Sequence, residues 1–133
     1  MMVSNIVLYR LKWLLIATFF SSILHYVDNI VFFADYPEPV WINPRQIDLF
    51  WVAMTPLAPI GYQQIKQGRW LIGAGLLVMY GVCNMLTLGH YNYAPFITIA
   101  FKIHAFILIE ALLGSILIGY ALALCLAQLK RCA

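Results

Sequence analysis

The sequence predicts an all-α protein, an integral membrane four-helix bundle with both termini in the cytoplasm, built as a single transmembrane domain over residues 1–133. Of these residues 64% are hydrophobic and only 10% are charged, which differs from the balance of a soluble globular domain. Four apolar segments approach or exceed the ~20 residues that a spanning helix needs. They are 13–34, 47–65, 70–90 and 98–127.

Basic residues set the expected orientation. Six of the eight lie before the first segment, between the second and third, or after the fourth, at Arg10, Lys12, Lys66, Arg69, Lys130 and Arg131. The positive-inside rule places these positions in the cytoplasm. Because they are few and sit at helix ends, the net charge of +3 does not indicate a nucleic-acid partner. The three cysteines are scattered and form no C-x-x-C pair, so no metal site is expected.

The first two segments are joined and shaped by prolines. The connection 34–44 contains Pro37, Pro39 and Pro44 and cannot continue a helix. It is expected to be an interfacial cap, with Tyr36 and Trp41 at headgroup level, or alternatively a lid over a pocket. In the second segment, Pro56 and Pro59 lie in mid-helix, where lost amide donors predict a kink.

Small residues dominate the packing faces of the last two segments. Trp70 opens the third, which carries four small residues, Gly73, Ala74, Gly75 and Gly81. The fourth carries a small residue at every fourth position, at Ala111, Ser115, Gly119 and Ala123, a pattern that lets helices approach closely. This stripe is expected to pack against a helix, either within the chain or in a second copy as a homodimer.

Seven polar side chains interrupt the apolar segments, and these are the strongest pointer to function because charge is costly in hydrocarbon. They are His25, Asp28, Asn29, Asn84, Lys102, His104 and Glu110. At about 1.5 Å of rise per helical residue, with the termini inside, all of them fall in the outer half of the membrane. The pattern therefore predicts one pocket, open on the outer side and closed within. Lys102 and the interfacial His90 are expected at the rim of this pocket.

Helical spacing indicates how these residues could be grouped. His25, Asp28 and Asn29 share one helix face, and a carboxylate beside an imidazole is suited to donating or accepting a proton. A hydrogen-bonded pair that only fixes packing is the alternative. Glu110 could pair with Lys102 or stay neutral. The inner half offers only Thr18, Ser21, Ser22 and Ser115, so no proton path through the whole membrane is expected.

Several short motifs resemble the EXPERA-like membrane proteins, the group of the emopamil-binding sterol isomerase and the sigma-2 receptor. The motifs are Asp28, Tyr36-Pro37, the run Ala58-Pro59-Ile60-Gly61-Tyr62, and the turn with Lys66, Gly68, Arg69 and Trp70. The chain departs from the group's pattern on the second helix, where a mid-membrane acid is missing. Asp48 lies at the outer end instead, and Glu110 could substitute from the fourth helix.

The resemblance implies a cavity that opens to the lipid and receives a lipophilic small molecule of sterol or isoprenoid type, possible isomerase chemistry, and no cofactor. It implies Asp28 and Glu110 as acid and base, with His25 and His104 as relay groups. Trp51 and Tyr80 would face a carbocation. The expected ligand-binding residues are Asn29, Trp51, Tyr80, Asn84 and Lys102.

Two other classes of protein remain open. In a b-type haem protein, His25 and His104 would be the axial ligands from separate helices, and a quinone or pigment would use the same cavity. A noncatalytic subunit or assembly factor of a membrane complex would use the polar residues and the small-residue stripe for contacts.

Overall fold

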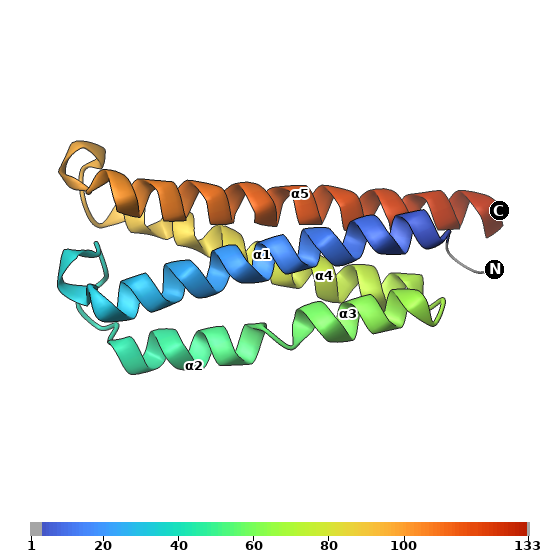
Figure 1. The fold of residues 1–133 in the computed structure, drawn as a ribbon, viewed down its shortest axis with the longest axis horizontal. Helices are drawn as coiled ribbons and strands as arrows, with labels where there is room; N and C mark the ends of the chain where they lie inside the picture. Colours follow the sequence, from blue (N-terminus) through green and yellow to red (C-terminus); the bar gives the residue numbers. More distant parts are fainter. Residues whose placement is uncertain (1–3, 133) are drawn as a thin grey trace.

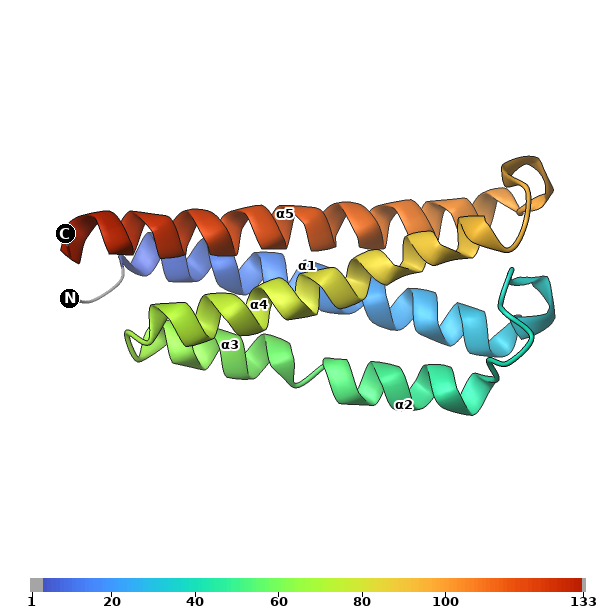
Figure 2. The ribbon, with the colours of Figure 1, turned by 180° about the vertical axis from the view of Figure 1, so that it is seen from behind.

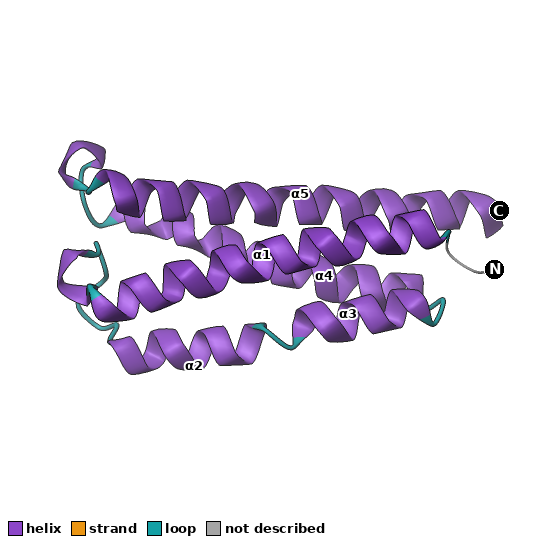
Figure 3. Ribbon diagram, viewed as in Figure 1, coloured by secondary structure: helices purple, strands orange, loops and turns teal. Residues whose placement is uncertain are grey.

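The fold is a helical bundle, as predicted. The structure is a computed structural model that describes residues 4–132, and no strand occurs among them. Five α-helices follow one another: α1 (Asn5–Val31), α2 (Pro44–Met54), α3 (Leu57–Lys66), α4 (Trp70–Met85) and α5 (Phe101–Cys132). Three 3-10 helices, η1 (Phe33–Asp35), η2 (Leu86–Asn92) and η3 (Phe96–Thr98), lie in the connections, and little of the chain is loop (Figure 3).

Helices α2 and α3 lie end to end and form one broken helix, so the bundle has four members (Figure 1 and Figure 2). The other three, α1, α4 continued by η2 to Asn92, and α5 to Lys130, are long and apolar enough to cross a membrane. These helices fit a membrane protein. Both termini lie at the same end of the bundle, here called the terminal end, and the connections 32–43 and 86–100 lie at the other, the loop end (Figure 1).

The predicted kink in the second segment is a full break. Helix α2 starts at a capping box in which the Asn43 and Gln46 side chains each accept from the other's amide, with Pro44 in the first turn. It ends where Pro56 lacks an amide hydrogen. Pro59 causes no damage, because it lies in the first turn of α3, where amides have no helical acceptor in any case.

A tight turn at the terminal end returns the chain from α3 to α4. Gly68 has a φ of +80°, a conformation that residues with a Cβ avoid. Its amide donates to the Ile65 carbonyl, and the amide of Arg69 donates to Gln64. Gly68 therefore ends α3 and allows α4 to pack antiparallel against it.

Glycines set the closest helix contacts. A Cβ built on Gly114 of α5 would lie 2.7 Å from the carbonyl oxygen of Gly81 on α4, and one on Gly73 would lie 2.8 Å from that of Gly61 on α3. The predicted close approach of the third segment is thus confirmed at Gly73 and Gly81.

The predicted small-residue stripe of the fourth segment packs within the chain only at its start, where Ala111 is buried and the Ser115 hydroxyl donates to the Met85 sulfur of α4. Ser115, Gly119 and Ala123 are exposed, and a Cβ on Gly119 would meet nothing within 4 Å. A four-residue repeat advances about 40° per step at 3.6 residues per turn, so the stripe turns away from the face that began buried. The contact with a second copy stays a prediction.

Candidate functional site

A histidine and a glutamate form a buried pair between α1 and α5. The Nδ1 atom of His25 is hydrogen-bonded to a carboxylate oxygen of Glu110, and the two residues are 2% and 1% exposed. The Thr87 hydroxyl lies 3.2 Å from the same Nδ1. Ser22 lies beside the Glu110 carboxylate and accepts a hydrogen bond of 3.1 Å from the Trp51 indole. One polar network thus joins α1, α2, η2 and α5.

Aromatic rings fix the plane of the His25 imidazole. The Tyr36 ring stacks on it at 5.6 Å between centroids, and the Phe106 ring lies parallel at 6.2 Å. His90 meets its edge at 5.5 Å. With Nδ1 bonded to Glu110, the other ring nitrogen, Nε2, is buried and has no protein partner among the described residues. In the neutral ring with its proton on Nδ1, that nitrogen is a free acceptor.

Asp28 belongs to a second group at the loop end. Its carboxylate accepts from the Tyr36 hydroxyl at 2.8 Å and from the Lys102 ammonium at 2.8 Å. The ammonium also lies 3.8 Å above the Phe32 ring. Burial, and then the hydrogen bond to Asp28, raise the pKa of the Tyr36 hydroxyl above its ordinary value, so this hydroxyl stays protonated and donates.

Glu38 anchors the connection 36–43, which we call the strap. Its carboxylate accepts from the Asn29 amide at 2.7 Å and lies 3.5 Å from Nδ1 of His90. The same His90 nitrogen is 3.2 Å from the Pro37 carbonyl. One acidic side chain therefore connects the strap to both α1 and η2.

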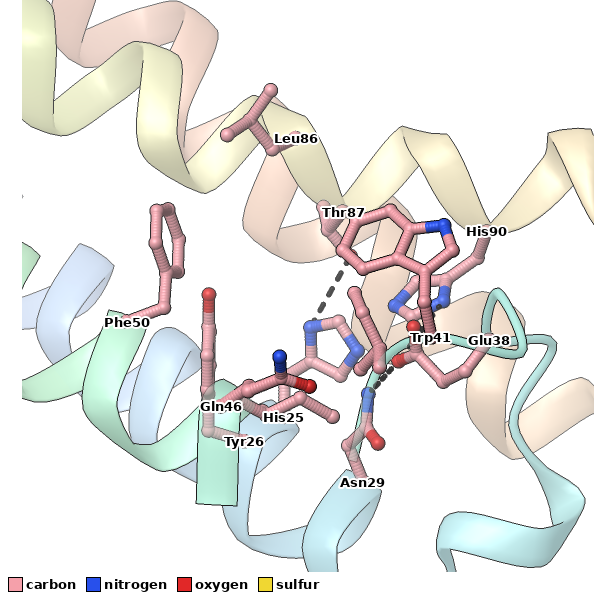
Figure 4. Close-up of a pocket in the computed structure, with 12 residues that line it drawn as sticks. His25, Tyr26, Asn29, Glu38, Trp41, Gln46, Phe50, Leu86, Thr87 and His90 are labelled. Atoms are coloured by element: carbon pink, nitrogen blue, oxygen red, sulfur yellow. Dashed lines mark hydrogen bonds and ion pairs between the residues drawn. The ribbon is translucent and has the colours of Figure 1, made fainter. Parts of the chain in front are cut away.

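A cavity of about 330 Å³ lies between α1, α2, η2 and the strap. Apolar groups form much of its wall, among them Trp41, Ile47, Phe50 and Leu86. Its polar lining consists of His25, Tyr26, Asn29, Glu38, Gln46, Thr87 and His90. In Figure 4, Phe50 and Leu86 lie at one end of the cavity and Trp41, Glu38 and His90 at the other, with the His25 ring between them.

The structure brings only some of the predicted residues to this cavity. His25 and Asn29 line it, and Glu110 lies behind His25. Two pairings that the sequence left open do not form: Asp28 is bonded to Lys102 and Tyr36 and not to His25, and Glu110 is bonded to His25 and not to Lys102. Lys102 lies in the first turn of α5, two turns from Glu110, at the level where α1 presents Asp28.

The remaining predicted residues lie apart from the cavity. Nε2 of His104 is 2.9 Å from the Phe96 carbonyl and must donate to it, while Nδ1 is 2.9 Å from the Tyr91 hydroxyl. Tyr80 and Asn84 are fully buried in α4, where the Asn84 amide donates to the Tyr80 carbonyl. Trp51 does not line the cavity and reaches the site through its hydrogen bond to Ser22 and its ring contact with Tyr26, at 6.5 Å between centroids.

Four residues of the site were not identified as such from sequence. Tyr36 and His90, expected at the interface, are 5% and 9% exposed, and Glu38 and Thr87 were not considered. Two sequence signals could have found them. Glu38 is held between two prolines in a short connection, and Thr87 and His90 are three residues apart, on one face of the chain that continues α4.

The fold and the site define a class: a helical bundle suited to a membrane, with a buried imidazole–carboxylate pair beside a small cavity. Comparisons with known protein families, with curated proteins and with solved structures gave no match.

Replacing Tyr36 by phenylalanine is expected to loosen the strap without emptying the cavity. The change removes the hydroxyl that donates to Asp28 and keeps the ring on His25. A hydrogen bond to a charged group contributes about 1.5–3 kcal/mol, and Asp28 keeps Lys102, so we expect a loss near the lower value, about 1.5 kcal/mol. Thermal unfolding in detergent measures it. Tyr93→Phe, at a half-exposed ring, is the control, and equal midpoints for the two variants would contradict the assigned role.

Proposed function

We propose that this chain is a multi-pass membrane protein whose cavity binds a lipophilic molecule of sterol or isoprenoid type. The observation that carries the proposal is the position of His25. It lines a cavity with apolar walls, its Nε2 has no partner in the part of the chain that the structure describes, and its Nδ1 is bonded to a buried carboxylate. Small-molecule sites combine mostly apolar walls with a few placed polar groups.

The cavity size favours a ligand that is only partly enclosed. A volume of about 330 Å³ is near the lower end of the ~300–1,000 Å³ typical of ligand pockets. Phe50 and Leu86 line the cavity and are also exposed on the outer surface of the bundle. The polar end of the ligand would lie at His25 and Asn29. Its apolar remainder would stay in the lipid beside Phe50 and Leu86.

The basic residues support an orientation with both termini in the cytoplasm. Arg10 and Lys12 precede most of α1, and Lys66 and Arg69 flank the turn before α4 at the same end as both termini. The cavity, at the loop end, would then lie in the outer half of the membrane.

We further propose acid/base chemistry at a carbon–carbon double bond. His25 would donate the proton of Nε2 to one alkene carbon, leaving a carbocation on the other, and loss of a proton from a neighbouring carbon back to Nε2 would shift the double bond. Glu110 stabilises the imidazolium before the first step and after the second. The motifs shared with the EXPERA-like proteins support the same ligand class and this isomerase-like chemistry.

Lipid analysis tests the binding proposal. Protein purified in mild detergent is expected to be colourless and to release a sterol or isoprenoid on solvent extraction, identified by mass spectrometry. Leu86→Trp, at the wall of the cavity, should reduce the bound lipid at least fivefold. Ile72→Trp, at an exposed position of α4 away from the cavity, should not. A Soret band would reject the proposal in favour of haem, and equal lipid in both variants would reject the cavity as the binding site.

A further inference from the structure

We propose that Glu38, His90, His25 and Glu110 form a proton-transfer row that connects the loop end of the bundle to the buried pair. This inference rests on the proposed acid/base function, because it gives Glu38 and His90 the task of exchanging protons with the group that would act on the ligand. The row begins in the strap, passes through η2 and α1, and ends on α5.

Along the row, the groups follow in the order carboxylate, imidazole, imidazole, carboxylate. The Glu38 carboxylate lies 3.5 Å from Nδ1 of His90, the His90 and His25 rings meet edge to face at 5.5 Å between centroids, and His25 is bonded to Glu110. Proton transfer needs hydrogen-bond reach or one intervening water. The contact between His25 and Glu110 is within that reach. The contact between Glu38 and His90, at 3.5 Å, is slightly longer than a hydrogen bond, and the contact between the two rings leaves a wider gap.

The cavity supplies room and polar partners for a water in that gap. His25 and His90 both line it, and its volume of about 330 Å³ exceeds the ~30 Å³ share of one water. Two buried acceptors without protein partners among the described residues belong to lining residues, Nε2 of His25 and Oδ1 of Asn29. A buried water makes about two to four hydrogen bonds, and these two atoms are suited to receive them.

Each transfer conserves the proton. A proton from outside water binds Glu38. When His90 is the neutral tautomer with its proton on Nε2, Glu38 passes the proton to Nδ1, which then donates to the Pro37 carbonyl, and Nε2 releases its own proton to the bridging water. The water passes one proton to Nε2 of His25, and His25 releases its Nδ1 proton to Glu110. One proton enters at Glu38 and one arrives at Glu110. Each of the two imidazole rings ends as its other neutral tautomer. Proton transfer in the opposite direction restores the starting tautomers.

The other titratable groups around the row do not extend it. Tyr26 of α1 and Tyr36 of the strap are neutral phenols, and Asp28 is occupied by Tyr36 and Lys102. Helix α2 contributes no titratable side chain to the cavity. Toward the terminal end, Thr18 donates to its own helix. The row therefore exchanges protons with water at the Glu38 end only. Such a row can reprotonate His25 but cannot carry protons across a membrane.

Nitrogen-15 NMR of labelled histidine tests the row directly, because the chain has only three histidines. The protein is embedded in lipid nanodiscs without added ligand, and the rate of proton exchange at the His25 ring is measured. Glu38→Gln retains an acceptor for Asn29, and His90→Gln retains a donor for the Pro37 carbonyl, so both keep the strap bonds. We expect each to slow exchange at least tenfold.

Asp48→Asn is the matched control, since Asp48 is an exposed carboxylate on α2 near the same end. It should leave the His25 rate unchanged. Unchanged rates in both row variants, or an equal slowing in the Asp48 variant, would overturn the row. Lipid extraction on the same samples separates the proposals. Slowed exchange without a bound lipid would support the row and reject the proposed function. A bound lipid with unchanged exchange would support lipid binding and reject the row.

Discussion

Replacing Glu110 by alanine is expected to lower the free energy of unfolding by about 3 kcal/mol, because it leaves a buried ring nitrogen of His25 without its hydrogen-bond partner, which costs about 1–3 kcal/mol. The His25 imidazole would remain in the bundle, 2% exposed, with only the Thr87 hydroxyl near its Nδ1. Equilibrium unfolding in mixed detergent and dodecyl sulfate micelles measures the loss.

Two variants separate the pair from a general effect on α5. Glu110→Gln retains an oxygen that can accept from His25, so its cost should be nearer the ~1 kcal/mol of a single hydrogen bond. Ile109→Ala changes the neighbouring, half-exposed side chain and should have little effect. If Glu110→Ala were no less stable than Glu110→Gln, the assigned pairing with His25 would be incorrect.

Replacing Gly114 by alanine is the second large expected effect. Its new Cβ would lie 2.7 Å from the Gly81 carbonyl oxygen and 3.1 Å from Cβ of Asn84, and backbone cannot move aside as a flexible side chain does. Helices α4 and α5 would have to separate. Overpacking costs about 1–3 kcal/mol, and we expect the upper part of that range from the same unfolding measurement.

Gly119→Ala is the matched control on the same helix. A Cβ at this position meets no atom within 4 Å, so the stability of the single chain should be equal to or slightly above that of the wild type, because alanine favours a helix by about 1 kcal/mol over glycine. A cost at Gly119 equal to that at Gly114 would instead indicate that the exposed stripe is covered in solution.

The apolar segments were predictable because lipid imposes a strong rule. A backbone in hydrocarbon must satisfy its own hydrogen bonds, so long apolar runs become helices. Helices α1, α4 and α5 each cover most of a predicted run, although α1 starts eight residues earlier than predicted and α5 ends five residues later. The break at Pro56 was likewise predictable in position, because the missing amide is a local property of one residue.

The pairing inside the site was less predictable. His25 and Asp28 share a helix face, yet they bond to different residues of α5, Glu110 and Lys102. Tyr36 folds back from the strap, stacks on His25 and hydrogen-bonds to Asp28. The position of Tyr36 depends on the path of a proline-containing loop, and the helical spacing of residues in the sequence does not predict the path of a loop. Glu38 was overlooked for the same reason. A carboxylate in a loop is expected to be exposed to water, and only the folded strap places this one against Asn29 and His90.

The break between α2 and α3 also has a consequence for how the chain enters a membrane during synthesis. Each half, of 11 and 10 residues, is far shorter than the ~20 residues that cross a bilayer alone. The pair must nevertheless run from the loop end to the terminal end, because α1 stops at one and α4 starts at the other (Figure 1). Its neighbours along that path are α1 and, through Gly61 and Gly73, α4. Stable insertion of this segment therefore has to wait until α4 has been made, so a nascent chain ending at residue 69 should leave it accessible to water.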